Sequence, residues 1–224
     1  MKRIVMLWRG FAAQLLAFAL IAVVAGSAQP ALAQSGNPAE AFVQQNVDRG
    51  YQILNNQSLS SEQRRDQFRN FLLNLTDLHR IGMFTLGQYA NNASPADLQS
   101  FERAFEDYAV TVYETRLGKY NGQTLKVTGS EVRAPDDVIV NAVVTAGGGA
   151  SQQPIHVAFR VRKTPDGRPI ITDMQVEGIW LALSQRSDFT SFLQQHGGSV
   201  SQLADHLRTQ AAQVRGEAHG NSVG

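Results

Sequence analysis

Cysteine is absent from the 224-residue chain. Its absence excludes disulfide bonds as a source of stability, excludes thiolate zinc sites, and excludes acylation of an N-terminal cysteine as in lipoproteins. A stable fold must therefore come from a packed hydrophobic core. The chain is long enough for one domain with such a core and short for two.

A strong net charge is also missing. The sequence has 20 Lys and Arg residues against 19 Asp and Glu residues. Three of the basic residues lie within the first 33 positions, so the remainder carries 17 against 19, a net charge of −2. Because nucleic-acid binding needs several Lys or Arg at the phosphates, this balance without a basic cluster argues against a nucleic-acid partner. It also weakens the case for tight binding to an anionic membrane surface.

Catalytic motifs are lacking as well. The chain has no Gly-x-Ser-x-Gly elbow and no His-Glu-x-x-His run, and its five histidines have no partners at metal-ligand spacing. The glycines at 147–149 are not followed by Gly-Lys-Ser/Thr, so they indicate a hairpin connection and not a phosphate loop. A triad assembled from distant residues stays open. We expect no enzyme activity, no cofactor and no metal site.

Two carboxylates, Asp173 and Glu177, lie on one predicted strand. The rise of a strand separates them by about 13 Å, too far for an acid and a base to cooperate directly. We interpret them as a solvated or ion-paired strand face, since charged residues usually stay exposed.

The N-terminus has the pattern of an export signal. Basic residues precede an apolar run over residues 11–25, and a small-residue cleavage pattern ends at Ala33. We expect residues 1–33 to be a signal peptide that is cleaved near Ala33. A retained membrane anchor is the alternative, but Gln14 interrupts the run and a spanning helix needs roughly 20 apolar residues.

Helix start signals recur through the first half of the remaining chain. Residues 37–40 combine an N-cap, a proline at the first helical position and a capping-box glutamate, so a helix is predicted from Pro38. Further helices are predicted after Ser60, after Asp77 and from Ser94. The last of these has an apolar stripe that comprises Leu98, Phe101, Phe105, Tyr108, Val112 and Tyr113.

The hydrophobic period changes from helical to alternating after residue 122. Alternating, β-branched segments are predicted as strands over residues 125–127, 138–144, 155–161 and 170–176. Gly178 breaks the alternation, and residues 179–183 are predicted as a short apolar bridge. The final helices are expected from Ser187 and after Ser199.

Helices, then about four antiparallel strands, then helices again indicate an α+β fold with helices on one face of a curved sheet. No internal repeat, long linker or composition break divides residues 34–214, so we predict one domain. Residues 215–224 are small and polar, and we predict a disordered tail there.

Residues 169–189 pass from strand-like alternation to a helical start and carry a recognisable motif. Its positions are Asp173, Val176, Glu177, Gly178, Ile179, Leu181, Arg186 and Phe189. They resemble the C-terminal signature of the MlaC family, also called the toluene-tolerance or Ttg2 family, in which Asp-x-x-Val-Glu-Gly-Ile/Val leads through apolar residues to Arg-x-x-Phe. Weaker resemblances extend over residues 68–87, 93–120 and 170–207.

The sequence also departs from the family pattern. Trp180 stands where the family usually has Ser, and Gln185 where it usually has Tyr. Tyr89 and Ala90 replace a frequent Trp-Arg pair. The resulting Ile-Trp-Leu-Ala-Leu-Ser-Gln-Arg run is similar to that of hopanoid-associated members called HpnM.

The resemblance implies an α+β fold of the NTF2-like type that encloses an apolar cavity. It also implies a periplasmic lipid-binding shuttle, which carries phospholipid or a hopanoid-type lipid between the inner and outer membranes as the soluble component of an ABC transport system. The implied partners are an inner-membrane ABC transporter complex and an outer-membrane lipoprotein complex. Two other functions stay open: a periplasmic adaptor that binds only proteins and, less favoured, a small isomerase with a related cone-shaped fold.

The resemblance also selects candidate lipid-binding residues. From the long helix and the sheet, the expected cavity residues are Phe101, Phe105, Tyr108, Val112, Val140, Val157, Phe159, Met174 and Val176. The expected residues of one closing wall are Ile179, Trp180 and Leu181. Arg186 is a candidate contact for a phosphate-bearing head group, and capping or ion pairing near a helix start is an equal alternative. A solid core would give nearly the same pattern as a lipid cavity, because both need an apolar helix stripe and alternating strands.

Overall fold

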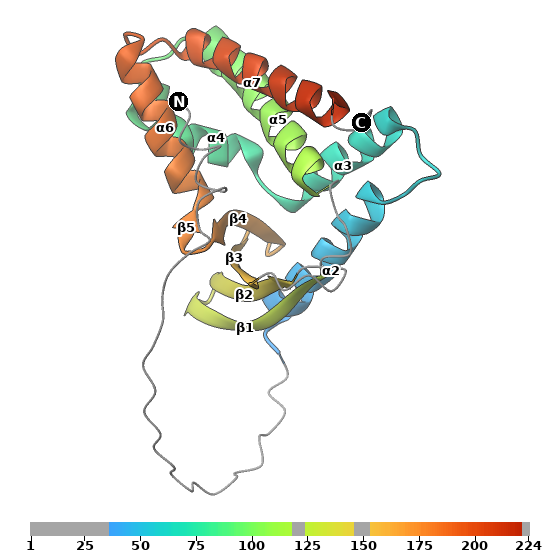
Figure 1. Ribbon diagram of the computed structural model, residues 1–224. Helices are drawn as coiled ribbons and strands as arrows, with labels where there is room; N and C mark the ends of the chain where they lie inside the picture. Colours follow the sequence, from blue (N-terminus) through green and yellow to red (C-terminus); the bar gives the residue numbers. More distant parts are fainter. Residues whose placement is uncertain (1–35, 118–123, 146–152, 221–224) are drawn as a thin grey trace, which may run out of the picture. The chain divides into compact units, whose positions relative to one another are not determined.

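A computed structural model describes residues 36–117, 124–145 and 153–220, all within one compact unit, Gly36–Gly224. The predicted signal peptide and the glycines at 147–149 lie outside the described residues. Helices precede and follow an antiparallel sheet, which confirms the α+β class, and Figure 1 shows the strands on one side and helices α4 to α7 on the other. No helix in the described part of the chain is long and apolar enough to cross a membrane.

The helices before the sheet begin at the predicted caps. They are α2 Pro38–Leu54, α3 Ser61–Leu75, α4 Leu78–Leu86 and α5 Pro95–Leu117, with a short 3-10 helix η1 Gly87–Asn91 after α4. The side-chain oxygens of Asn37 and Asp77 accept backbone N–H groups of the following turns at 3.0 and 2.9 Å. Ser60 and Gln63 form a complete capping box. Each cap satisfies an N–H group that has no partner inside its helix.

The first helix after the sheet, α6 Leu181–Gln195, begins earlier than predicted. The sequence indicated a start at Ser187 and an apolar bridge over residues 179–183. Trp180 occupies the N-cap position without a side-chain cap hydrogen bond. The missing cap comes from a neighbouring strand, which is why local sequence did not reveal the start.

The last helix, α7 Val200–Gly220, confirms the start predicted after Ser199. Ser199 Oγ accepts Gln202 N at 3.3 Å. The helix continues past the predicted boundary at residue 214 into the segment expected as a tail. Arg215 is held there by ion pairing to α5.

Five strands form one sheet in the described residues, in the order β1-β2-β3-β4-β5 with antiparallel neighbours. They are β1 Thr124–Ala134, β2 Asp137–Thr145, β3 Ile155–Lys163, β4 Pro169–Val176 and β5 Ile179–Trp180. The strand missing from the prediction is β5, a two-residue strand that pairs with the end of β4. Register shifts interrupt the β1–β2 and β3–β4 pairings. Such irregularities bend strands and increase their twist, which accounts for the curved sheet in Figure 1.

Buried apolar residues form three clusters in the described part of the chain. The helical cluster joins α4, α5, α6 and α7 and includes Phe101, Phe105, Phe189, Leu193, Leu203 and Leu207. The sheet cluster joins α2 to the inner face of β2, β3 and β4 and includes Val43, Val140, Ala142, Val157 and Phe159. The α2–α3 cluster includes Leu54, Phe68, Phe71 and Val110 of α5. Because α2 contributes to the last two clusters, it links the helices to the sheet.

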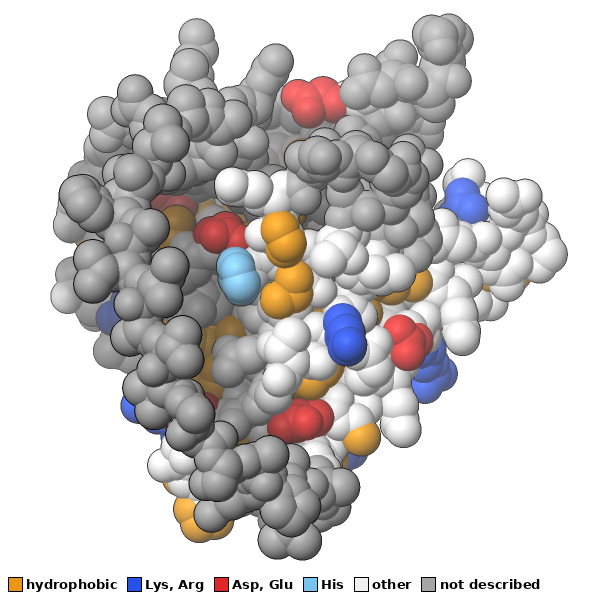
Figure 2. Space-filling model, turned by 60° about the horizontal axis from the view of Figure 1, so that its bottom comes forward, with side chains coloured by type: hydrophobic (Ala, Val, Ile, Leu, Met, Phe, Trp, Pro, Cys, Tyr) orange, Lys and Arg blue, Asp and Glu red, His pale blue; other side chains and the backbone are white. Residues whose placement is uncertain are grey.

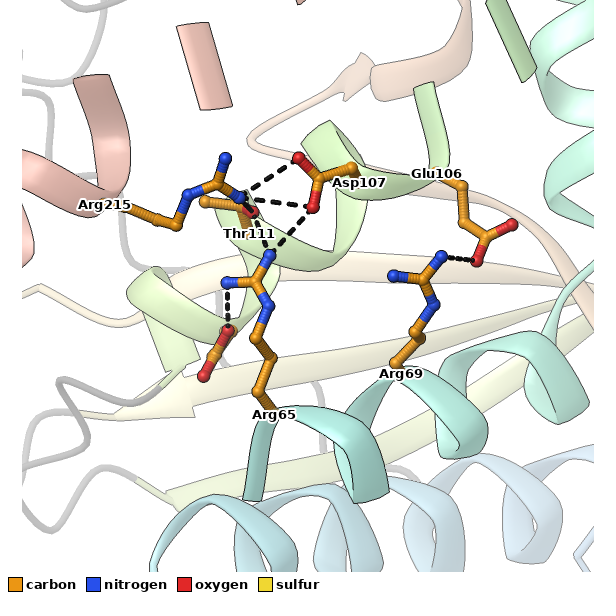
Figure 3. A network of polar contacts seen from close by, with 7 residues as sticks. Arg65, Arg69, Glu106, Asp107, Thr111 and Arg215 are labelled. Atoms are coloured by element: carbon orange, nitrogen blue, oxygen red, sulfur yellow. Dashed lines mark hydrogen bonds and ion pairs between the residues drawn. The ribbon is translucent and has the colours of Figure 1, made fainter. Parts of the chain in front are cut away.

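A polar network ties α3, α5 and α7 together (Figure 3). Arg65 of α3 donates to Asp107 and Thr111 of α5 at 2.9 and 2.8 Å. Arg215 of α7 donates to the same two residues at 3.1 and 2.9 Å. Arg65 also pairs with Glu114 at 3.1 Å. Asp107 therefore neutralises guanidinium groups from two helices, beside a fully buried threonine.

Replacing Asp107 tests this network. We expect Asp107→Ala to lower the free energy of unfolding by about 1–3 kcal/mol, because Arg65 and Arg215 lose their shared carboxylate. Arg69→Met is the control, since it removes only the single Arg69–Glu106 pair and should cost at most about 1 kcal/mol. Urea denaturation compares the two variants, and equal losses would contradict a special role for Asp107.

Candidate functional site

Two apolar rows cross the inner face of the sheet. One row is Val140, Phe159 and Met174, and the next is Ala142, Val157 and Val176. Strand alternation places both rows on the side that α2 covers through Ala39 and Val43. Met174 and Val176 are only partly buried. The cover that α2 provides is therefore incomplete at β4.

The aromatic stripe of α5 packs into the helical cluster. The rings of Phe101 and Phe105 have centroids 5.7 Å apart, and Phe189 of α6 meets them edge-on at 6.0 and 6.2 Å. Tyr108 lies at the margin of this cluster, and Val112 is partly buried. The structure thus divides the predicted cavity residues of α5 and of the sheet between two clusters. Their joint contact with one ligand stays a prediction.

The family-like motif contains a tight turn between β4 and β5. Glu177 and Gly178 have φ angles of 46° and 82°, and both central residues of a type I′ hairpin turn need positive φ. Glu177 N donates to His156 O of β3 at 2.9 Å, and its carboxylate accepts His156 N. Glu177 therefore fastens the turn to the sheet, and its side chain is exposed, as the sequence suggested.

Asp173 connects β4 to the start of α6. Its Oδ1 accepts Ala182 N at 3.0 Å and Met174 N at 2.8 Å. Because Trp180 offers no acceptor at the N-cap, the Asp173 carboxylate caps the helix from outside and also meets the positive end of its dipole. Burial raises the pKa of Asp173, and the two N–H groups offset part of that effect. The carboxylate is a partly buried anchor for the start of α6, whereas the sequence indicated a solvated or ion-paired strand face.

The predicted closing wall spans β5 and the first residue of α6. Ile179 is 49% exposed, while Trp180 and Leu181 are partly buried. Trp180 pairs with Gln175 of β4. The three residues thus lie beside the Asp173 cap, and their contact with a lipid stays a prediction.

Arg186 lies where α6 meets the end of α4. Its guanidinium carbon is 5.0 Å from the centroid of the Phe84 ring. Gly87 lies against another side of the Arg186 guanidinium group, because a Cβ atom there would lie 3.1 Å from Arg186 Nη2. No carboxylate pairs with Arg186 in the described residues. The cation rests on a solvent-facing apolar surface, since Phe84 and Leu183 are 41% and 59% exposed.

Two hollows flank α3. One of about 440 Å³ lies between α2 and α3. The other, of about 320 Å³, lies among the end of α3, the start of α4 and the β3–β4 turn, with His79, Glu106 and Arg168 in its walls. The sequence predicted neither, because each depends on how α3 packs against its neighbours.

No group of three or more His, Asp or Glu in the described residues could hold a metal ion. His196 and His206 both stack on Phe192, with centroid distances of 3.9 and 4.6 Å. Burial lowers the pKa of His206, and His196 acts in the same direction. These rings therefore serve the contact between α6 and α7.

Surface charge is mixed on the face shown in Figure 2. Among the described side chains visible there, cationic and anionic groups are scattered among neutral ones. The distribution agrees with the nearly equal numbers of acidic and basic residues.

A family model described as "MlaC protein" matches residues 44–209. Among solved structures, the fold resembles that of a phospholipid-binding protein from Ralstonia solanacearum, determined in complex with a phospholipid, with a TM-score of 0.68 and 24% sequence identity. The match covers 79% of this chain and 98% of that one. At this identity the likeness describes the fold.

Variants at Asp173 test the cap. Asp173→Ala loses the acceptor of two N–H groups and should lower the free energy of unfolding by about 1 kcal/mol. Asp173→Asn keeps an acceptor oxygen but removes the charge. Because folding raises the pKa of Asp173, the stabilisation that its carboxyl group contributes to the fold decreases as the pH rises from about 4 through the folded-state pKa. Urea denaturation between pH 4 and 8 should show that the free energy of unfolding of Asp173→Asn rises relative to that of wild type as the pH increases. A difference between the two proteins that does not change with pH would contradict this assignment.

Proposed function

This chain belongs to the MlaC family, whose model matches residues 44–209, and from that premise we propose that it is a lipid-binding shuttle of the periplasm. Its cargo in this proposal is a phospholipid or a hopanoid-type lipid. The phospholipid complex of the Ralstonia solanacearum protein supports the choice, because that protein shares this fold. A binding role also agrees with a site built from apolar rows and packing contacts.

The main support for the proposal is that many apolar side chains of the sheet cluster are only partly buried. In the described residues this cluster has seven buried members and ten partly buried apolar side chains packed against it. The helical cluster has the opposite balance, with twelve buried and nine partly buried. A sheet needs its apolar face covered, and many side chains of this face are only partly buried. Lipid chains would supply the missing layer.

The energetics of transport require such a surface. A two-chain lipid with on the order of 30 methylenes loses roughly 24 kcal/mol of hydrophobic stabilisation when its chains cross water unprotected. A carrier offsets that loss by offering apolar contacts of its own. It must still release the lipid, so its contacts cannot exceed those of a membrane by much.

The proposed contact residues divide by their position. Direct contact with the chains is assigned to the sheet residues Val140, Val157, Phe159, Met174 and Val176. Further lining is assigned to Phe101, Phe105, Tyr108 and Val112 of α5 and to Ile179, Trp180 and Leu181. Because Phe101 and Phe105 already pack on Phe189, their part in the site is to form the wall that holds α6. Arg186 is a candidate for the head group, since its guanidinium lacks a carboxylate partner in the described residues and lies on exposed Phe84.

Export and partners complete the proposal. Removal of residues 1–33 as a signal peptide would deliver the protein to the periplasm. There it would exchange lipid with an inner-membrane ABC transporter complex and an outer-membrane lipoprotein complex. Trp180, in place of the usual small residue, supports a cargo with flat rings such as a hopanoid, because an aromatic face packs well on a rigid apolar ring system.

Native mass spectrometry of the mature protein, purified from cells with intact membranes, tests lipid binding. We expect a stoichiometric lipid and transfer of lipid between vesicles. Met174→Gln should weaken lipid binding by about tenfold, since it replaces one apolar contact of about 1.4 kcal/mol, and should leave the folded monomer intact. Val132→Gln is the matched control at a strand position that is 61% exposed.

Two outcomes would overturn the proposal. Wild-type protein without bound lipid and without transfer activity would favour an adaptor that binds only proteins. Unfolding of Met174→Gln would show that the side chain belongs to a solid core, since a buried polar group without a partner is costly.

A further inference from the structure

The groove between α2 and α3 has the size of a small-ligand site. Its volume is about 440 Å³, within the range of ordinary ligand pockets. Its described lining residues are Phe42, Asn46, Arg49, Ile53, Gln67, Asn70, Phe71, Asn74 and Leu75. The two helices approach closely beside it, because the Cβ position of Gly50 lies 3.3 Å from Phe71 Cε1.

The groove combines an apolar floor with amides and one cation. Four of its described lining residues carry primary amides, one carries a guanidinium, and none carries a carboxylate. The Arg49 guanidinium carbon is 6.0 Å from the Phe71 ring centroid, and Arg49 has no ion pair in the described residues. Arg65 and Arg69 of α3, in contrast, are both paired with carboxylates of α5. Arg49 is therefore a cation left for an external anion.

Two of the amides are held in place by their own helices. Asn46 Nδ2 donates to Phe42 O at 2.8 Å, and Asn74 Nδ2 donates to Asn70 O at 2.7 Å. Each keeps its side-chain oxygen as an acceptor. Gln67 and Asn70 add amide donors along α3. The rim can thus both accept from hydroxyl groups and donate to phosphate oxygens.

The floor of the groove connects two apolar regions of the fold. Phe42 packs against the sheet cluster, while Ile53 and Leu75 pack against the α2–α3 cluster. The end of α3 is bonded to the sheet, because Thr76 Oγ1 donates to Ile171 O of β4 at 2.6 Å. The groove therefore lies near the junction between the helices and the sheet.

We infer that this groove holds the phosphate-bearing head of the lipid, with Arg49 paired to the phosphate and the amides bonded to the remaining polar head. The inference rests on the proposed lipid-binding function and adds the chemistry of the head. Arg186 fits this role less well, because the Phe84 ring and the Gly87 backbone already occupy two sides of its guanidinium. Acyl chains that leave the groove would run along the floor toward the sheet cluster.

The lining also selects among phosphate-bearing heads. A head with hydroxyl groups, such as glycerol, satisfies the amide acceptors. A quaternary ammonium head would meet the like charge of Arg49 and no carboxylate, so it gains no anionic partner in the described lining. The expected order of affinity is phosphatidylglycerol above phosphatidylcholine.

Displacement of a fluorescent lipid by defined probes tests the inference. Arg49→Gln should weaken phosphatidylglycerol binding by about tenfold, as expected for loss of a charge-assisted hydrogen bond, and change diacylglycerol binding less than about twofold. Arg103→Gln, an exposed arginine of α5 outside both hollows, is the matched control and should bind all probes as wild type does. Thermal unfolding checks that each variant is folded.

A blocking variant provides an independent arm. Asn70 is exposed, so Asn70→Trp fills the groove without entering the core, and it should reduce binding of every two-chain lipid. Unchanged binding by Asn70→Trp, or a phosphatidylglycerol loss in Arg186→Gln with none in Arg49→Gln, would overturn the inference while the proposed function stands. Glycerol 3-phosphate binding as strongly as phosphatidylglycerol would identify a site for free phosphate esters instead. Failure of wild type to bind any lipid probe would instead remove the proposed function itself.

Discussion

The bond between Asp173 and the first turn of α6 is the contact on which the helical layer depends. Trp180 supplies no acceptor at the N-cap, so a carboxylate from β4 fixes both the start and the direction of the helix. About two turns later the same helix delivers Phe189 against Phe101 and Phe105. The motif that resembles a family signature thus determines how α6 packs after β4 and β5. Its two acidic residues, Asp173 and Glu177, accept hydrogen bonds from backbone N–H groups, and the two do not form a catalytic pair.

The helical cluster is closely packed, whereas the sheet cluster is less completely covered. The helical cluster is closed by aromatic contacts and by the Asp107 network, which connects three helices. The sheet cluster has α2 as its main cover and keeps many apolar side chains partly exposed. The proposed carrier role would benefit from this division, because a firm helical frame allows one apolar face to be less completely covered. The same division explains why a binary pattern of apolar and polar residues fits both a solid core and a cavity.

Features encoded within a few residues were predictable. Caps at Asn37, Ser60 and Asp77 gave the starts of their helices, and alternation gave the central strands. The start of α6 was not predictable in this way, because its cap lies on the preceding strand. The sequence also paired the α5 stripe with the sheet, whereas Phe101 and Phe105 pack on α6. Periodicity shows that a helix has an apolar face, but it does not show which element that face meets. The α2–α3 groove escaped prediction for the same reason.

If the α2–α3 groove holds a head group as proposed, Gly50 affects which head fits there without touching it. A methyl group at this position would stand 3.3 Å from the Phe71 ring, a separation that obliges the ring or its helix to give by a few tenths of an ångström. Because glycine has no side chain, it allows α2 and α3 to approach closely at this position. In the proposed head-group site, a larger residue here would hold the helices farther apart and so widen the groove. In this architecture, selectivity can evolve through the distance between two helices while every residue that lines the groove stays the same.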